Sequence, residues 1–140
     1  MTSQLNVDTI VDKAGSGGTN VKVGNTSTYV SDGGNVTQNA VQGIAKAWGN
    51  YDGSGTTLED SFNYSSATDV NAGDYDMNFT NNMANANYAP TSTICAGGDR
   101  NAGGGGIGLE TDEFRIIVYN SGGGNEDSTD VVSSVHGDLA

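Results

Sequence analysis

The residues best suited to nucleophilic chemistry are the single cysteine and the single histidine, Cys95 and His136. A nucleophile of this kind needs a base beside it that is held in place by an orienting acid. Nothing in the sequence brings Cys95 and His136 together. We therefore expect a partly buried thiol and a surface imidazole, no catalytic residues, and a protein that is not an enzyme.

Two carboxylates, Asp74 and Asp76, stand at alternate positions of a predicted strand and so share one face. Paired carboxylates hydrolyse glycosidic bonds in many enzymes. Such enzymes generally need an extended groove lined by aromatic side chains, and a domain this small offers little room for one. We therefore expect Asp74 and Asp76 to form the solvated edge of a hairpin.

Residues 69–76 superficially resemble a calcium-binding loop. Glycine and aspartate stand in the wrong order there, and Thr80 occupies the place of the bidentate glutamate. A turn rich in Asx residues is the favoured interpretation, and a weak surface calcium site stays open. The glycines at 103–106 are not followed by the Lys-Ser/Thr pair of a phosphate-binding loop. We assign no cofactor and no metal ligand.

The chain is strongly acidic, with 5 Lys and Arg against 17 Asp and Glu and a net charge of −12. Nucleic-acid-binding proteins cluster their basic residues, whereas these five are scattered. We therefore expect neither nucleic acid as a partner nor membrane insertion. No signal peptide and no long apolar segment is visible, so we expect synthesis in a host cytoplasm.

The composition predicts an all-β protein. Only 34% of the 140 residues are hydrophobic, and 22 are glycine. The polar residues are mainly Asn, Ser and Thr, which favour turns and short strands over long helices. From about residue 45 onward the pattern alternates with period two and is interrupted by turn signals every eight to twelve residues or so, which predicts a β-sandwich of about seven strands.

Several strands of this sandwich have distinct predicted places. Residues 75–79 show the cleanest alternation, and residues 114–119 are the most apolar and are predicted to be central. Residues 88–95 are predicted to form an edge strand because they contain Pro90. Residues 131–136 form the last predicted strand.

Two further assignments concern side chains of the first predicted strands. Trp48, the only tryptophan, is predicted to be a core residue at the start of the sandwich rather than a platform for stacking a glycan. The next strand is predicted to place four side chains on one face, namely Leu58, Asp60, Phe62 and Tyr64.

The first residues contain an alternating strand with no hairpin partner nearby, followed by a glycine-rich stretch. A lone strand cannot satisfy its own backbone groups. We therefore expect it to add to a β-sheet of another subunit, with Leu5, Val7 and Ile10 as its apolar contacts.

A short helix is predicted before the sandwich, because Val36, Ala40 and Ile44 recur every four residues. Packed around a threefold axis, these side chains would form a trimer interface. A connector lying on the domain is the alternative. The predicted organisation is thus an attachment strand over 1–12, a glycine-rich linker with the helix over 13–44, and the β-sandwich over 45–140.

The sequence also resembles tail-fibre and related virion structural proteins of bacteriophages that infect marine bacteria and cyanobacteria. The order and spacing of the matching stretches carry this resemblance, and no single motif is diagnostic. These stretches are 5–10 with the following glycine run, 41–48 with Asn50, Gly53 and Gly55, then 60–64, 73–79, 83–88 and 114–115.

The resemblance implies a homotrimeric fibre-like component of the virion. Its N-terminus would attach to another tail or capsid subunit, and its β-sandwich would point outward to a host surface receptor. The chain is short and has no long shaft repeat, which leaves open a capsid or tail decoration or cement protein. The loops expected to present ligand contacts lie over 97–106 and 121–127, with candidate residues Gly97, Asp99, Arg100, Asn101, Gly105 and Asn125.

Overall fold

A computed structural model describes residues 27–30, 37–95, 100–104 and 108–140. The chain divides into two compact units, 1–41 and 42–140. In the first unit, β1 (Thr28–Val30) pairs antiparallel with β2 (Thr37–Asn39). The backbone N–H of Ala40 extends this pairing by donating to the carbonyl of Ser27 at 2.9 Å.

The predicted helix over 35–44 is wrong for the residues that the structure describes, which contain no helix. Residues 37–39 form β2, and residues 40–43 form a turn. Two turns of helix are marginal in water, and Gly43 weakens them further, whereas pairing with β1 satisfies the backbone groups of this segment. Ala40 is thus a turn residue, Ile44 is 62% exposed, and Val36 lies outside the described residues.

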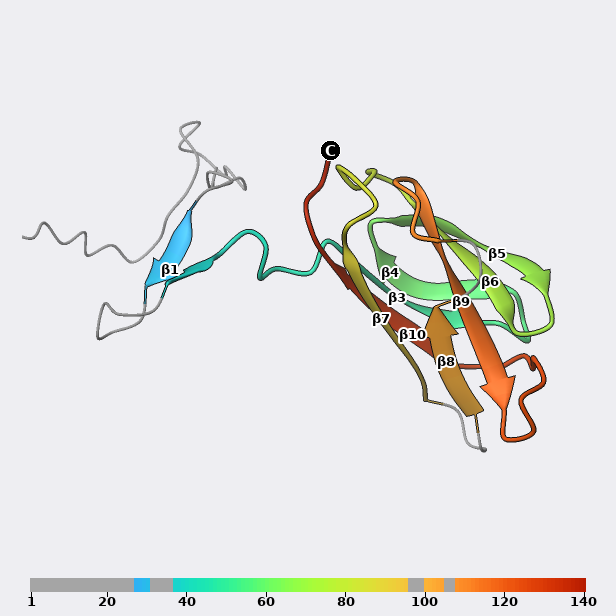
Figure 1. Ribbon diagram of the computed structural model, residues 1–140. Coiled ribbons are helices and arrows are strands. Elements are labelled where there is room, and N and C mark those ends of the chain that lie inside the picture. Colours follow the sequence, from blue (N-terminus) through green and yellow to red (C-terminus); the bar gives the residue numbers. More distant parts are fainter. Residues whose placement is uncertain (1–26, 31–36, 96–99, 105–107) are drawn as a thin grey trace, which may run out of the picture. The chain divides into compact units, whose positions relative to one another are not determined.

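The second unit is a sandwich of two antiparallel four-stranded sheets, as predicted in class (Figure 1). The first sheet has the order β4-β3-β10-β7, and the second has the order β5-β6-β9-β8. The strands are β3 (Ala47–Asp52), β4 (Thr57–Phe62), β5 (Tyr64–Asn71), β6 (Asp74–Phe79), β7 (Ala89–Ile94), β8 (Arg100–Gly104), β9 (Glu113–Asn120) and β10 (Val131–His136).

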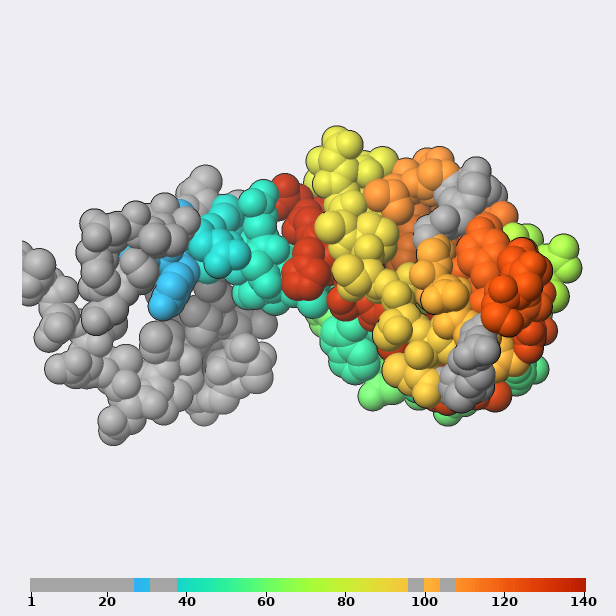
Figure 2. Space-filling model, turned by 60° about the horizontal axis from the view of Figure 1, so that its bottom comes forward, coloured from blue at the N-terminus to red at the C-terminus, as the bar shows by residue number. Residues whose placement is uncertain are grey.

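Most of the strands lie where the alternation predicted them. β6 alternates strictly between half-buried and buried side chains, and β9 lies between β6 and β8 inside its sheet. β7, which contains Pro90, is an edge strand of the first sheet. β8 is an additional strand in a stretch that was predicted to be a loop. In Figure 2 the yellow residues of β7 lie beside the gold residues of β8, where the edges of the two sheets meet.

Between β4 and β5 a single residue, Asn63, carries the chain from the first sheet to the second. Asn63 has a φ of +62°, which asparagine tolerates better than most residues. Its side-chain oxygen accepts hydrogen bonds from the backbone and side-chain amides of Asn81, at 2.7 and 3.0 Å. This corner turns Phe62 outward and Tyr64 into the core, so the prediction that they share one face is wrong.

Aromatic rings fill one part of the core between the sheets. Phe79 and Phe114 stack with their ring centroids 5.8 Å apart, and Tyr64 stacks on Phe79 at 5.9 Å. Tyr88 presents its ring edge-on to Phe79 at 5.7 Å. Each such pair contributes about 0.5–1.5 kcal/mol beyond simple burial. The buried apolar side chains are Ala47, Tyr51, Tyr64, Tyr75, Met77, Phe79, Met83, Tyr88, Phe114, Ile116, Val118, Val131 and Val135.

Candidate functional site

Trp48 lies on the outer face of the first sheet and is 42% exposed, so its predicted place in the core is wrong. The alternation of β3 explains this. Ala47, Gly49 and Tyr51 are all buried on the inner face, and the side chain between two of them must point the other way. The spacing of three between Trp48 and Tyr51 already carried this signal, because it places them on opposite faces.

Trp48 belongs to a row of side chains that crosses all four strands of the first sheet. It pairs directly with Phe62 on β4 and with Ser134 on β10, and Ser134 pairs in turn with Thr91 on β7. Phe62 is 52% exposed. We call these four residues the aromatic–hydroxyl row. Side chains directly opposite each other on one face of a sheet are in contact range, so one half of the row is aromatic and the other half carries hydroxyl groups.

Core residues pack against the inner face of the strands that carry the aromatic–hydroxyl row. A Cβ atom at Gly49 would lie 2.7 Å from the ring of Tyr64, so only glycine lets this ring approach β3 so closely. The Tyr64 hydroxyl shares a hydrogen bond of 2.9 Å with the Ser133 hydroxyl, and burial raises the pKa of Tyr64 to about 12. The backbone under Trp48 is therefore fixed by close packing.

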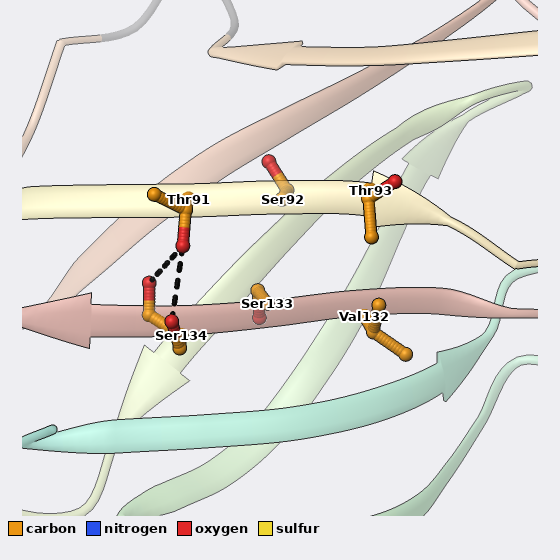
Figure 3. Close-up of a pocket in the computed structure, with 6 residues that line it drawn as sticks. All are labelled: Thr91, Ser92, Thr93, Val132, Ser133 and Ser134. Atoms are coloured by element: carbon orange, nitrogen blue, oxygen red, sulfur yellow. Dashed lines mark hydrogen bonds between the residues drawn. The ribbon is translucent and has the colours of Figure 1, made fainter.

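The hydroxyl half of the row borders a shallow depression along β7 and β10 (Figure 3). The Thr91 and Ser134 hydroxyl oxygens lie 3.0 Å apart, and the Thr91 hydroxyl also donates to the Ser134 carbonyl at 3.3 Å. The depression has a volume of about 250 Å³ and is lined by Thr91, Ser92, Thr93, Val132, Ser133 and Ser134. Its mouth offers hydroxyl groups to solvent.

A second row runs parallel to the first on the same outer face. It consists of Asp60, Asn50, Val132 and Thr93, which are cross-strand partners in this order. The Asn50 side-chain amide donates to the carboxylate of Asp130 at 3.5 Å. The two rows contain no lysine or arginine. These two rows thus combine a small aromatic surface with neutral and acidic hydrogen-bonding groups.

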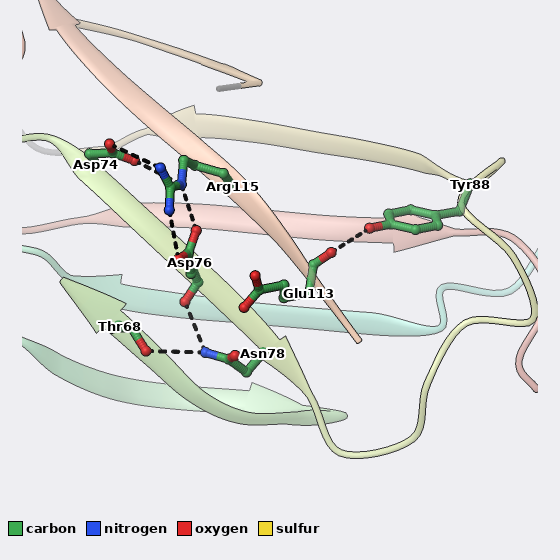
Figure 4. A network of polar contacts seen from close by, with 7 residues as sticks. All are labelled: Thr68, Asp74, Asp76, Asn78, Tyr88, Glu113 and Arg115. Carbon is green, nitrogen blue, oxygen red and sulfur yellow. Dashed lines mark hydrogen bonds and ion pairs between the residues drawn. The ribbon is translucent and has the colours of Figure 1, made fainter. Parts of the chain in front are cut away.

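A polar network on the second sheet is built around Arg115 of β9 (Figure 4). Its guanidinium lies against Asp76 and Asp74 of β6, with Nε 2.6 Å from an oxygen of Asp76 and 3.2 Å from one of Asp74. The hydrogen bond to Asp76 raises the pKa of Arg115. Next to it, Asn78 donates to the Thr68 hydroxyl at 3.2 Å. Burial raises the pKa of the Glu113 carboxyl, and the charge of Asp76 adds to this effect.

Asp74 and Asp76 are therefore not the solvated edge that the sequence predicted. Their strand β6 lies between β5 and β9, and both side chains are only about one-sixth exposed. Both carboxylates lie against the guanidinium of Arg115, with Nε 3.2 Å from Asp74 and 2.6 Å from Asp76, so neither faces an open groove as the acid of a glycosidase does. The described residues contain no group of three or more His, Cys, Asp or Glu side chains that could hold a metal ion.

A half-buried acid, Asp127, holds the turn between β5 and β6. Asp127 accepts hydrogen bonds from the backbone N–H of Gly73 at 2.6 Å and from the Tyr75 hydroxyl at 3.0 Å. Burial and the hydrogen bond to Asp127 raise the pKa of Tyr75. Tyr75 also meets the Tyr51 ring edge-on, with the centroids 5.0 Å apart. These contacts fix the loop before β10 on the end of the sandwich.

The structure separates the two residues considered for nucleophilic chemistry. Cys95 follows β7 directly and is exposed, so the prediction of a partly buried thiol is wrong, and its backbone N–H donates to the carbonyl of Asp130 before β10. His136 is at the opposite end of the same strand pair, across from Ala89. Six residues of strand place the two ends about 17 Å apart, which is too far for a nucleophile and its base.

The predicted ligand loops are only partly described. Gly97, Asp99 and Gly105 lie outside the described residues, as do the attachment residues Leu5, Val7 and Ile10. Arg100 and Asn101 belong to β8 rather than to a loop.

The remaining loop residue, Asn125, is exposed and bridges to Tyr119. Arg100 forms an ion pair with Glu126, and this hydrogen bond lowers the pKa of Glu126. The structure thus places Arg100 and Asn125 on neighbouring segments, but on the second sheet, away from the aromatic–hydroxyl row.

Comparison with other proteins adds no functional assignment. No protein-family model, curated protein or solved structure matches the chain significantly. Among the described residues there is no helix long and apolar enough to cross a membrane.

Proposed function

We propose that this chain is a fibre-like structural protein of a bacteriophage virion. Its N-terminal part attaches to a tail or capsid subunit, and its sandwich is presented outward for host-surface recognition. This role needs no enzymatic activity. The separation of Cys95 from His136, and the engagement of Asp74 and Asp76 by Arg115, support a non-enzymatic role.

One observation carries the proposal: the sandwich is complete without the first 41 residues. All its strand pairs and its whole buried core lie within 42–140. A domain that closes its own core does not need the preceding segment for its fold. In that segment the described apolar side chains Tyr29 and Val30 are 65% and 50% exposed, as a contact surface requires.

Within this proposal, the strand with Leu5, Val7 and Ile10 adds to a sheet of the neighbouring virion subunit. The protein assembles as a homotrimer, but not through a helix at 37–44, because that segment is a strand and a turn. The exposed hairpin residues Tyr29 and Val30 are the alternative contacts for subunit association.

The test is incorporation into particles. We expect the full chain to be found on virions by antibody labelling, and a chain without residues 1–12 to be absent from them while its sandwich still folds. Incorporation of the truncated chain at the normal level would contradict the attachment role. Particles that lose integrity without the protein, but adsorb normally to cells, would instead assign it a purely structural role as a decoration or cement protein.

A further inference from the structure

We infer that the outer face of the first sheet binds a neutral glycan, with Trp48 and Phe62 as its stacking surface. A neutral glycan bound at this face would be the host-surface receptor, and this biological purpose rests on the function proposed above. The binding itself is testable independently of the virion.

The exposure of the two aromatic side chains is the first argument. Trp48 is 42% exposed and Phe62 is 52% exposed, and they face each other across β3 and β4. Neither ring is part of the buried core, which the inner face of the same strands supplies. Rigid, exposed aromatic side chains provide contact area at little cost in conformational entropy, and here close packing around Gly49 holds the strand that carries one of them.

The arrangement of polar groups is the second argument. The aromatic–hydroxyl row continues from Trp48 to the hydroxyls of Ser134 and Thr91, and Asn50 and Asp60 lie in the adjacent row. Four neighbouring strands span about 14 Å, so the row can accommodate a short oligosaccharide. A pyranose ring presents C–H groups on its face and hydroxyls around its edge. The face fits the aromatic half, and the edge fits the donors and acceptors beside it.

Charge and area exclude other occupants. The two rows contain no lysine or arginine but include Asp60, and the chain carries a net charge of −12. An acidic polysaccharide or a nucleic acid would therefore be repelled. A stable contact with a second copy needs about 800 Å² on each partner with an apolar centre, from which serine is depleted. Two rings beside Ser134 and Thr91 do not provide such a centre.

The experiment uses the full chain and intrinsic fluorescence. Trp48 is the only tryptophan, so its emission reports directly on this face. We expect a blue shift on titration with a neutral polysaccharide (laminarin, xylan or amylose), together with retarded migration in native gels that contain it. Alginate serves as the anionic probe and should give neither effect.

Variants locate the site. Trp48→Ala and Phe62→Ala should each weaken retardation at least about tenfold, and the isosteric Thr91→Val should weaken it several-fold. Val70→Ala is the matched control, because Val70 is 45% exposed on β5 of the other sheet and should leave binding unchanged. Circular dichroism of each variant verifies its fold. We expect every variant to fold, because the substituted side chains are exposed.

Several outcomes would overturn the assignment. The first is that the wild-type chain responds to none of the three neutral polysaccharides. The second is a preference for alginate, and the third is a concentration-dependent dimer that Trp48→Ala abolishes. Adsorption of the labelled chain to host cells separates this inference from the proposed function. Equal adsorption of the wild type and both aromatic variants would keep the recognition role and overturn this face as the surface that carries it. Glycan binding without adsorption would keep this site and contradict the recognition role.

Discussion

Arg115 and Asp76 lie directly opposite each other on β9 and β6, and the guanidinium donates two hydrogen bonds to the carboxylate, at 2.6 Å from Nε and 2.8 Å from Nη2. Their side chains are only 14% and 15% exposed. A two-point contact of this kind is among the stronger polar interactions in proteins. It joins two adjacent strands of the second sheet at a point where a lone charge would be poorly solvated.

Replacing Asp76 should therefore destabilise the sandwich. Asp76→Ala removes the two-point partner of Arg115 and leaves Asp74 and Glu113 as its acidic neighbours, and we expect a loss of about 1–3 kcal/mol in the free energy of unfolding. Urea denaturation measures this loss. Asp60→Ala is the matched control, since Asp60 is exposed and its change should cost less than about 0.5 kcal/mol. Equal losses in the two variants would show that the ion pair contributes nothing specific.

Gly73 should tolerate no side chain. Its φ is +65°, and a Cβ atom there would lie 2.6 Å from both the Glu126 nitrogen and the Val118 oxygen. We expect Gly73→Ala to cost about 3 kcal/mol or more, because backbone strain and a clash with backbone atoms add. Gly123→Ala isolates the strain, since Gly123 has a φ of +82° but open space around it, and should cost about 1 kcal/mol. Thermal unfolding of both variants decides whether the clash matters.

The strand pattern of the sandwich could be predicted because it is local. In β6, β9 and β10 alternation with period two fixes which side chains are buried, and nothing distant is needed to recognise it. β8 escaped prediction because its glycines carry no alternation, and its pairing with β9 supplies the order. The helix was predicted from a stripe of three residues, and pairing with β1 overrides so weak a signal.

The candidate site could be predicted only in part. The alternation around Trp48 was sufficient to place it on the face of β3 that Tyr51 does not occupy. Its pairing with Phe62 was not predictable, because that register depends on the shift between Asn50 and Tyr51, where Glu59 of β4 is the extra residue, and on the corner at Asn63. Ser134 and Thr91 join the row only through the insertion of β10 between β3 and β7. Such long-range topology leaves no signal within a short segment of the sequence.

Buried tyrosines should make the protein sensitive to alkali. Burial raises the pKa of Tyr64 and of Tyr88 from 10.0 to about 12. A raised pKa in the folded state stabilises the fold fully below the unfolded value, and this contribution is lost as the pH rises from about 10 towards 12. For Tyr64, which is 6% exposed, the loss amounts to about 2–3 kcal/mol.

The measurement is urea denaturation as a function of pH, with tyrosinate absorbance recorded in parallel. We expect the free energy of unfolding to fall steeply between pH 10 and 12, in the window that the two raised pKa values define. Tyr64→Phe should reduce this fall by the contribution of Tyr64 to it. The substitution also removes the hydrogen bond to Ser133. A wild-type curve that stays flat through this window would contradict the prediction.

Tyr51 and Tyr75, which pack against each other, should differ in how loss of the hydroxyl group changes the stability of the protein. The Tyr75 hydroxyl donates to Asp127 at 3.0 Å, while the Tyr51 hydroxyl has no hydrogen-bond partner among the described residues. Both rings are fully buried and contact each other edge-on, so substitution by phenylalanine preserves the packing in both cases. Tyr75→Phe deprives the Asp127 carboxylate of a donor and the Ser128 backbone N–H of an acceptor, and it should cost about 1.5–3 kcal/mol. Tyr51→Phe removes only an unpaired polar group and should be neutral or slightly stabilising. Urea denaturation of the two single variants gives the comparison directly, and a greater loss for Tyr51→Phe would show that the hydrogen bonds of the Tyr75 hydroxyl contribute nothing to stability.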